Sequence, residues 1–157
     1  MIPKDAILQF RKGSKMSASL AELIKSGFGI KEDYNCTEKI VRGANITYDL
    51  GLPEDALLMM GGFGGGMGLG ETCGTITGAV AVISAMLVKD NAHSTPDLKS
   101  ATQAYIDQFR CRLGDEIECR NLRPKYRTKE TGCDRIIITA AEILDQIAKK
   151  YYYKKDL

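Results

Sequence analysis

Cysteines are the residues of this 157-residue sequence best suited to chemistry. Thiolates bind soft metals and iron–sulfur clusters, and pairs of thiols exchange with disulfides. No two cysteines have the Cys-x-x-Cys spacing of zinc fingers, thioredoxin-like sites or covalent haem attachment, so the sequence has no c-type haem motif. The five cysteines are Cys36, Cys73, Cys111, Cys119 and Cys133.

Cys73 lies in a glycine-rich stretch, GGFGGGMGLGETCGTITG, which spans residues 61–78 and holds nine of the sixteen glycines. A phosphate-binding loop is one interpretation. However, the stretch lacks the lysine of the Walker motif and never has the Gly-x-Gly-x-x-Gly spacing, so no nucleotide motif is present. Two interpretations therefore remain open. The glycines permit close packing against another element, or they form a tight loop that supports the Cys73 thiol.

In the packing interpretation, Gly70, Gly74 and Gly78 recur every four residues and form a bare ridge on a helix. Such a ridge permits close approach of a second subunit or of a bound group. In the other interpretation, the glycines let a loop fold tightly beside Cys73 and form the floor of its site. The loop glycines that would do so are Gly64, Gly65, Gly66, Gly68 and Gly70.

The hydrophobic pattern is helical along the whole chain, and no alternating run is long enough to indicate a sheet. We therefore expect an all-α fold, a compact single-domain bundle of about six helices over residues 1–157, with a glycine-rich loop before a buried helix. Asn35 and Glu38 have the spacing of a capping box at one helix start. The expected helical segments are 17–26, 36–51, 53–60, 71–88, 96–113, a short one at 119–123 that ends at Pro124, and 132–152.

Four of the cysteines fall at the starts of these expected helices. Cys36 follows the N-cap Asn35, Cys73 lies in a first turn, and Cys119 and Cys133 each begin a segment. Free amides and the helix dipole favour a thiolate at such positions, so we expect a lowered pKa, above all for Cys73. The alternative is that the cysteines are buried small apolar residues.

Charge and hydropathy exclude several classes of protein. The net charge is +2 and the basic residues are scattered, so we expect no binding to nucleic acid. Residues 72–88 carry no charge, but several threonines, a serine and two glycines make a buried core helix the better interpretation than a membrane span. The first residues lack the features of a signal peptide, so we expect a cytoplasmic protein, where disulfides are disfavoured.

Four blocks of the sequence resemble the C-GCAxxG-C-C family over about residues 20–150. The blocks are NC at 35–36, GFGGGMGLGETCGTITGA at 62–79, ECRNL at 118–122 and GCDRIIITAAEIL at 132–144. The middle block departs from the family name, because Cys73 precedes Gly74 and Thr75 stands in place of the alanine. The resemblance implies a redox or metal-linked role for Cys36, Cys73, Cys119 and Cys133, and it leaves Cys111 outside the pattern.

Three functions follow from these observations. The first prediction is a redox-active protein whose four cysteines hold an iron–sulfur cluster or another thiophilic metal. The second is a dithiol–disulfide redox protein, in which one thiol, that of Cys73 or Cys36, attacks and a second thiol resolves. The third is a helical binding or assembly module with structural cysteines. In each case we expect a homo-oligomer, and the first two also require a redox partner that the sequence does not identify.

Overall fold

The computed structural model describes residues 18–153, which contain seven α-helices and no strand. This confirms the all-α prediction. Residues 1–17 and 154–157 lie outside the described range, and they include the first residue of the segment expected at 17–26 and the stretch searched for a signal peptide. The helices are α2 (Leu20–Lys25), α3 (Cys36–Thr47), α4 (Glu54–Leu58), α5 (Gly74–Leu87), α6 (Pro96–Arg112), α7 (Cys119–Tyr126) and α8 (Asp134–Ile147).

Three short helical turns of other types complete the chain. A 3-10 turn, η1 (Met59–Phe63), follows α4, and a π-type turn, η3 (Ala148–Tyr152), follows α8. Between η1 and α5 lies η2 (Gly66–Gly70), in which Met67 and Gly68 have left-handed backbone angles, so that η2 is a coiled turn rather than a regular helix. The expected glycine-rich loop is therefore folded into two tight turns.

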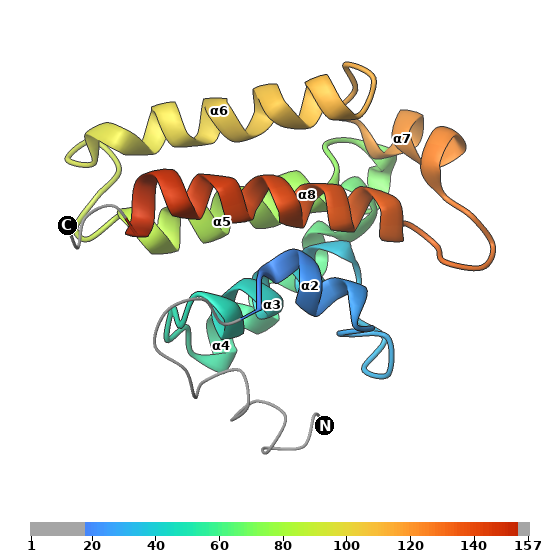
Figure 1. Ribbon diagram of the computed structural model, residues 1–157, viewed down its shortest axis with the longest axis horizontal. Helices are drawn as coiled ribbons and strands as arrows, with labels where there is room; N and C mark the ends of the chain where they lie inside the picture. Colours follow the sequence, from blue (N-terminus) through green and yellow to red (C-terminus); the bar gives the residue numbers. More distant parts are fainter. Residues whose placement is uncertain (1–17, 154–157) are drawn as a thin grey trace.

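The helix α8 lies at the centre of the fold. It contacts α2, α3, α5, α6 and α7, and in Figure 1 it runs alongside α5 and α6. Its apolar residues recur at helical spacing and are buried, as expected from the sequence. The helices α2, α3 and α4 pack on one side, and α7 lies at the end of the α5–α6–α8 layer, beside the glycine-rich turns (Figure 1).

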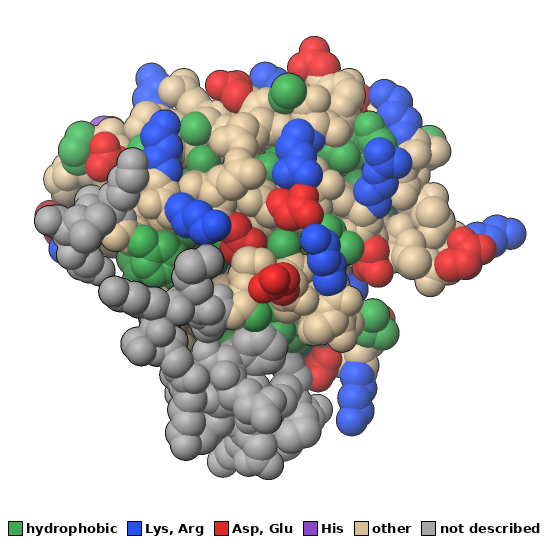
Figure 2. Space-filling model, viewed as in Figure 1, with side chains coloured by type: hydrophobic (Ala, Val, Ile, Leu, Met, Phe, Trp, Pro, Cys, Tyr) green, Lys and Arg blue, Asp and Glu red, His purple; other side chains and the backbone are tan. Residues whose placement is uncertain are grey.

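The uncharged segment expected to form a core helix does so as α5. Nine of its fourteen residues are buried, and α3, α6 and α8 all contact it. No helix within residues 18–153 is long and apolar enough to cross a membrane. On the face shown in Figure 2, lysine and arginine side chains are interspersed with aspartate and glutamate, as the scattered charges of the sequence indicate.

Asp145 connects three segments that are far apart in the sequence. Its carboxylate accepts hydrogen bonds from the backbone amides of Leu20 at 2.9 Å and Ala21 at 3.0 Å, and from the Tyr48 hydroxyl at 2.8 Å. Free amides at a helix start need such acceptors. The first turn of α2 is therefore capped partly by α8, and the N-terminal helices are fixed to the central helix.

Several helix boundaries differ from the expectation. The helix α2 spans only Leu20–Lys25 of the expected 17–26, and α3 ends at Thr47 rather than near residue 51. The helix α5 begins at Gly74 rather than near Glu71, because residues 71–73 pair with another segment described below. The helix α7 continues through Pro124 to Tyr126 instead of ending there. Pro124 is the sixth of the eight residues of α7, so it removes a single intrahelical hydrogen bond, and the helix ends only two residues later.

Candidate functional site

The capping box predicted at the start of α3 forms and also holds the glycine-rich turns. The Asn35 side chain accepts from the Glu38 amide at 3.0 Å, and the Glu38 carboxylate accepts from the Asn35 amide at 2.9 Å. The remaining side-chain donor of Asn35 binds the carbonyl of Gly61 at 2.9 Å. Gly64 lies against the same asparagine, because an added Cβ there would overlap its side chain. The residue that starts α3 thus also places the segment before Cys73.

A short antiparallel pairing brings Cys73 and Cys119 together. The Cys73 amide donates to the Ile117 carbonyl at 2.8 Å, and the Cys119 amide donates to the Glu71 carbonyl at 2.7 Å. Thr72 and Glu118 form the bridge between these bonds. Residues on either side of a bridge face the same side of the pair, so both thiols point the same way. Cys73 becomes the N-cap of α5, and Cys119 is the first residue of α7.

Gly74 brings the Cys36 thiol close to the backbone of α5. The Thr37 hydroxyl donates to the Gly74 carbonyl at 3.0 Å, and a Cβ added at Gly74 would lie 2.6 Å from the Cys36 sulfur. Gly78, one turn later on α5, packs against Thr37 and Val41 of α3. Another helix therefore approaches α5 closely at Gly74 and Gly78, as the glycine spacing predicts.

Two details of the predicted glycine ridge are wrong. Gly70 precedes α5 and lies against Arg120 instead, because the pairing of residues 71–73 delays the helix start. The helix that approaches Gly74 and Gly78 is α3 of the same chain, so this ridge is not available to a second subunit. Gly66, which has a positive φ, has no room for a side chain either, since a Cβ would lie 2.5 Å from backbone atoms of Glu71.

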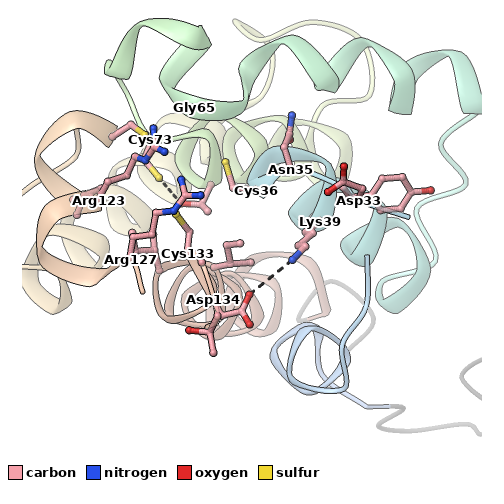
Figure 3. A pocket seen from close by; sticks show the side chains of 18 residues that line it. Asp33, Asn35, Cys36, Lys39, Gly65, Cys73, Arg123, Arg127, Cys133 and Asp134 are labelled. Atoms are coloured by element: carbon pink, nitrogen blue, oxygen red, sulfur yellow. Dashed lines mark hydrogen bonds and ion pairs between the residues drawn. The ribbon is translucent and has the colours of Figure 1, made fainter. Parts of the chain in front are cut away.

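One cavity of about 380 Å³ is lined by four of the five cysteines, Cys36, Cys73, Cys119 and Cys133. Cys133, the residue before α8, completes the set, and Gly65 forms part of the wall (Figure 3). Cys111 is exposed on α6 and does not line this cavity. All five cysteines are free thiols. We call the surrounding space the four-cysteine cavity; its thiols are those of Cys36, Cys73, Cys119 and Cys133.

Two arginines that the sequence analysis missed also line the cavity. Arg123 and Arg127 lie beside the thiols on one side, and on the other Lys39 forms an ion pair with Asp134 at 3.8 Å (Figure 3). For Arg123 the signal was present, because it follows Cys119 by four residues and so shares its helix face. Arg127 lies just past the end of α7, where the sequence spacing gives no such signal.

Thr75 is a further residue that the sequence analysis did not place in the site. It is fully buried, and its hydroxyl lies 3.1 Å from the Cys73 sulfur at hydrogen-bonding distance. The Tyr105 hydroxyl donates to the Thr75 carbonyl at 3.4 Å. Thr75 stands where the family name has alanine, and this departure could have marked it.

The thiols of Cys73, Cys119 and Cys133 are not activated in the way expected from their helix starts. Burial raises the pKa of Cys73 to about 11, although the hydrogen bond with Thr75 opposes the shift. Burial also raises the pKa of Cys119, against the effect of Arg123, and that of Cys133, against the effect of Arg127. Neighbouring cysteines add to each increase, because thiolates repel one another. The prediction of a lowered pKa for Cys73 is thus wrong, since loss of solvation outweighs the helix terminus.

In the part of the chain that the structure describes, no group of three or more histidine, cysteine, aspartate or glutamate side chains could hold a metal ion as the side chains stand. The four thiols surround the cavity rather than meet at one point, so a ligand in the cavity has to span them. Their chemistry, four soft sulfur donors with cationic side chains nearby, suits a thiophilic group.

The fold and the site together define an all-α protein with four thiols around one cavity, a class suited to thiol-based redox or metal chemistry. A family model described as "Putative redox-active protein (C_GCAxxG_C_C)" matches residues 34–147, a range that includes all four thiols. The chain belongs to this family. Searches of the curated proteins and of the solved structures found no match.

Proposed function

We propose that this protein is a redox protein that holds an iron–sulfur cluster, or another thiophilic metal centre, in the four-cysteine cavity. The observation that carries the proposal is that cysteines from four separate segments line one cavity, while the fifth cysteine is exposed elsewhere. Cysteine thiolates are the usual ligands of iron–sulfur clusters. If the cysteines served only as small apolar residues, nothing would require their thiols to face a common space.

The electrostatics of the cavity favour a ligand role over a free nucleophile. Burial raises the pKa of Cys73 to about 11, so its thiol stays protonated at neutral pH when no cation is present. A coordinating metal ion deprotonates a thiol by supplying the missing positive charge. Arg123 and Arg127 line the same cavity and would offset part of the negative charge of the thiolates. The cavity therefore suits a metal centre whose thiolate ligands give it net negative charge better than it suits a free thiolate that attacks a disulfide.

The arrangement of the thiols supports a cluster in preference to a single ion. They lie around a cavity of about 380 Å³, and a cluster of several iron and sulfide ions spreads its thiolate ligands more widely than one ion does. Such a cluster, when bound, supplies one-electron transfer. The chain would contribute burial from water, the arginine charges, and the Thr75 hydroxyl beside the Cys73 sulfur, all of which influence a reduction potential.

A dithiol–disulfide redox protein is the second candidate. Cys36 and Cys133 are only partly buried, and Cys36 is close enough to raise the pKa of Cys133. Oxidation of this pair would form one sulfur–sulfur bond and pass two electrons and two protons to an acceptor. A reducing compartment such as the cytoplasm would keep the thiols free under either proposal. This candidate leaves Cys73 and Cys119 without a role.

The experiment that separates these functions is the metal, sulfide and free-thiol content of protein purified without oxygen, together with its visible spectrum. Iron with acid-labile sulfide and a broad visible absorbance supports the cluster. Zinc without sulfide indicates a structural thiolate site. No metal, with thiols that pair reversibly on mild oxidation, supports the dithiol mechanism, and five inert thiols indicate a helical assembly module.

Two serine variants test the assignment of the thiols. Cys73→Ser removes a ligand from the cavity, and we expect it to abolish bound metal, whereas the dithiol candidate predicts that the reversible Cys36–Cys133 pair persists in this variant. Cys111→Ser is the matched control, because Cys111 is exposed on α6, and we expect it to behave as the wild type. If the two variants bind the same amount of metal and have equally reactive thiols, the assignment is wrong.

A further inference from the structure

Positive charge without a carboxylate partner lines one side of the four-cysteine cavity. Arg123 and Arg127 lie there beside the thiols (Figure 3). Burial raises the pKa of Cys119 and that of Cys133, and Arg123 opposes the first rise while Arg127 opposes the second, so both charges act within the cavity. Within residues 18–153, neither arginine forms an ion pair with a carboxylate.

Most other arginines of the described chain do have a partner. Five arginines besides Arg123 and Arg127 lie within residues 18–153, and Arg110 alone among them has none. Arg135 lies over the ring of Tyr126, 4.9 Å from its centre. The other three form ion pairs, Arg42 with Glu54, Arg112 with Glu142 and Arg120 with Glu118. Two unpaired arginines at one cavity are therefore not the general pattern of this fold.

The carboxylates that line the cavity do not neutralise these two arginines. Asp134 pairs with Lys39 at 3.8 Å. Asp33 lies beyond Lys39, on the side away from the arginines (Figure 3). One lysine and two carboxylates therefore share one side of the cavity, and two guanidinium groups without a carboxylate remain on the other.

The chemistry of the two arginines indicates which ligand they would accept. A guanidinium group holds five N–H donors in one plane, and these match the oxygens of a carboxylate, sulfate or phosphate group. Sulfur is only a weak acceptor, so the thiols do not replace such oxygens. The cavity volume of about 380 Å³ lies in the range of small-molecule sites, and both arginines are exposed, so an anion can reach them from solvent.

We propose that the four-cysteine cavity is also a binding site for a small oxyanion, which Arg123 and Arg127 hold beside the thiols. The ligand class is a small molecule with a carboxylate, sulfate or phosphate group. A thiolate-bound metal centre would use the arginines only as nearby charges, whereas an oxyanion also uses their hydrogen-bond donors. Binding of the anion does not require the metal centre proposed above.

Protection of the cavity thiols by sulfate tests the proposal. The protein is Cys111→Ser, reduced and free of metal, so that every remaining thiol lines the cavity, and the reagent is iodoacetamide, which is uncharged. Sulfate replaces chloride at constant ionic strength. We expect sulfate to slow the reaction until the effect saturates, because the bound anion covers the thiols. The half-saturating sulfate concentration should rise at least about tenfold in Arg123→Gln and in Arg127→Gln.

Arg110→Gln is the matched control, because Arg110 is also an exposed arginine but does not line the cavity. The rates with and without sulfate are compared within each variant, so a direct effect of the substitution on a thiol cancels. Both cavity arginines are exposed, so these variants should fold, and circular dichroism checks this.

Three results would overturn the proposal: no saturable protection by sulfate, protection that both cavity-arginine variants retain in full, or protection that Arg110→Gln weakens as much as they do. The assay contains no metal. A negative result therefore refutes the oxyanion site alone, and the metal content of protein purified without oxygen decides the proposed function separately.

Discussion

Replacing Gly74 with alanine should damage the site and the fold together, and replacing Gly78 should not. A Cβ at Gly74 would overlap the Thr37 hydroxyl, lie 2.6 Å from the Cys36 sulfur and 3.0 Å from the Phe63 carbonyl. These atoms belong to a buried threonine, a thiol of the cavity and the backbone, and none can move freely. Overpacking of this kind costs about 1–3 kcal/mol. Displacing Thr37 also breaks its hydrogen bond to the Gly74 carbonyl, which contributes about 1 kcal/mol.

Gly78→Ala is the matched change on the same helix. Its Cβ would lie 3.3 Å from Thr37 and 3.4 Å from Val41, so its neighbours need to shift by only a few tenths of an ångström. Alanine inside a helix is favoured over glycine by about 1 kcal/mol, which offsets most of that strain. At Gly74, the first residue of α5, the gain is smaller. We therefore expect Gly74→Ala to lower the free energy of unfolding by about 2–3 kcal/mol and Gly78→Ala to change it by less than about 1 kcal/mol.

Urea unfolding followed by circular dichroism measures both values, and the reaction of Cys36 with a thiol reagent reports on the site. We expect a changed Cys36 rate in Gly74→Ala only. Equal destabilisation by the two substitutions, or an unaltered Cys36 in a destabilised Gly74→Ala, would refute the argument that the glycine is needed for the approach of α3.

The other predictions concern charge and the Asp145 network. Burial raises the folded-state pKa of Cys73 from an ordinary value of about 9 to about 11, so its contribution to the stability of reduced, metal-free protein is complete below pH 9 and is lost as the pH rises to about 11. The loss in the free energy of unfolding is at most about 3 kcal/mol. Urea unfolding between pH 9 and about 11 should therefore show that this free energy declines more steeply with pH in the wild type than in Cys73→Ala. Parallel curves for the two proteins would contradict this prediction. Arg127 lowers the pKa of Cys133, so Arg127→Gln should raise that pKa, and a thiolate absorbance titration that leaves it unchanged or lowers it would show that the charge does not act on this thiol. Asp145→Ala removes the acceptor of three hydrogen bonds and should cost about 3 kcal/mol, whereas Tyr48→Phe removes one and should cost about 1 kcal/mol; equal losses in thermal or urea unfolding would argue against the shared carboxylate.

Local features of the structure could be predicted from the sequence, and those set by distant segments could not. The start of α3 depends on Asn35 and Glu38, which are three residues apart, so the capping box was visible. The start of α5 depends on hydrogen bonds between residues 71–73 and 117–119, and no local pattern reveals that pairing. The error at this boundary is therefore a consequence of tertiary structure.

The same distinction applies to the candidate site. The four cysteines were found from their helix starts and from the family resemblance, and the structure brings them to one cavity. The raised pKa values of Cys73, Cys119 and Cys133 could not be predicted, because the helix terminus is a local effect whereas burial depends on the whole fold. The position of Arg123 follows from its spacing of four residues from Cys119 on α7, whereas Arg127 lies beyond the end of that helix and reaches the cavity only through the tertiary fold.

The separate origin of the four thiols has a consequence for how the site depends on the fold. A Cys-x-x-Cys site draws two ligands from one turn and can persist when distant parts of a protein unfold. Here Cys36 belongs to α3, Cys119 to α7, and Cys73 and Cys133 precede α5 and α8. Any group held by all four thiols joins these four helices, and it binds the folded chain far better than the unfolded one. Binding then adds directly to the stability of the whole fold, because a ligand that prefers the native state stabilises it by mass action.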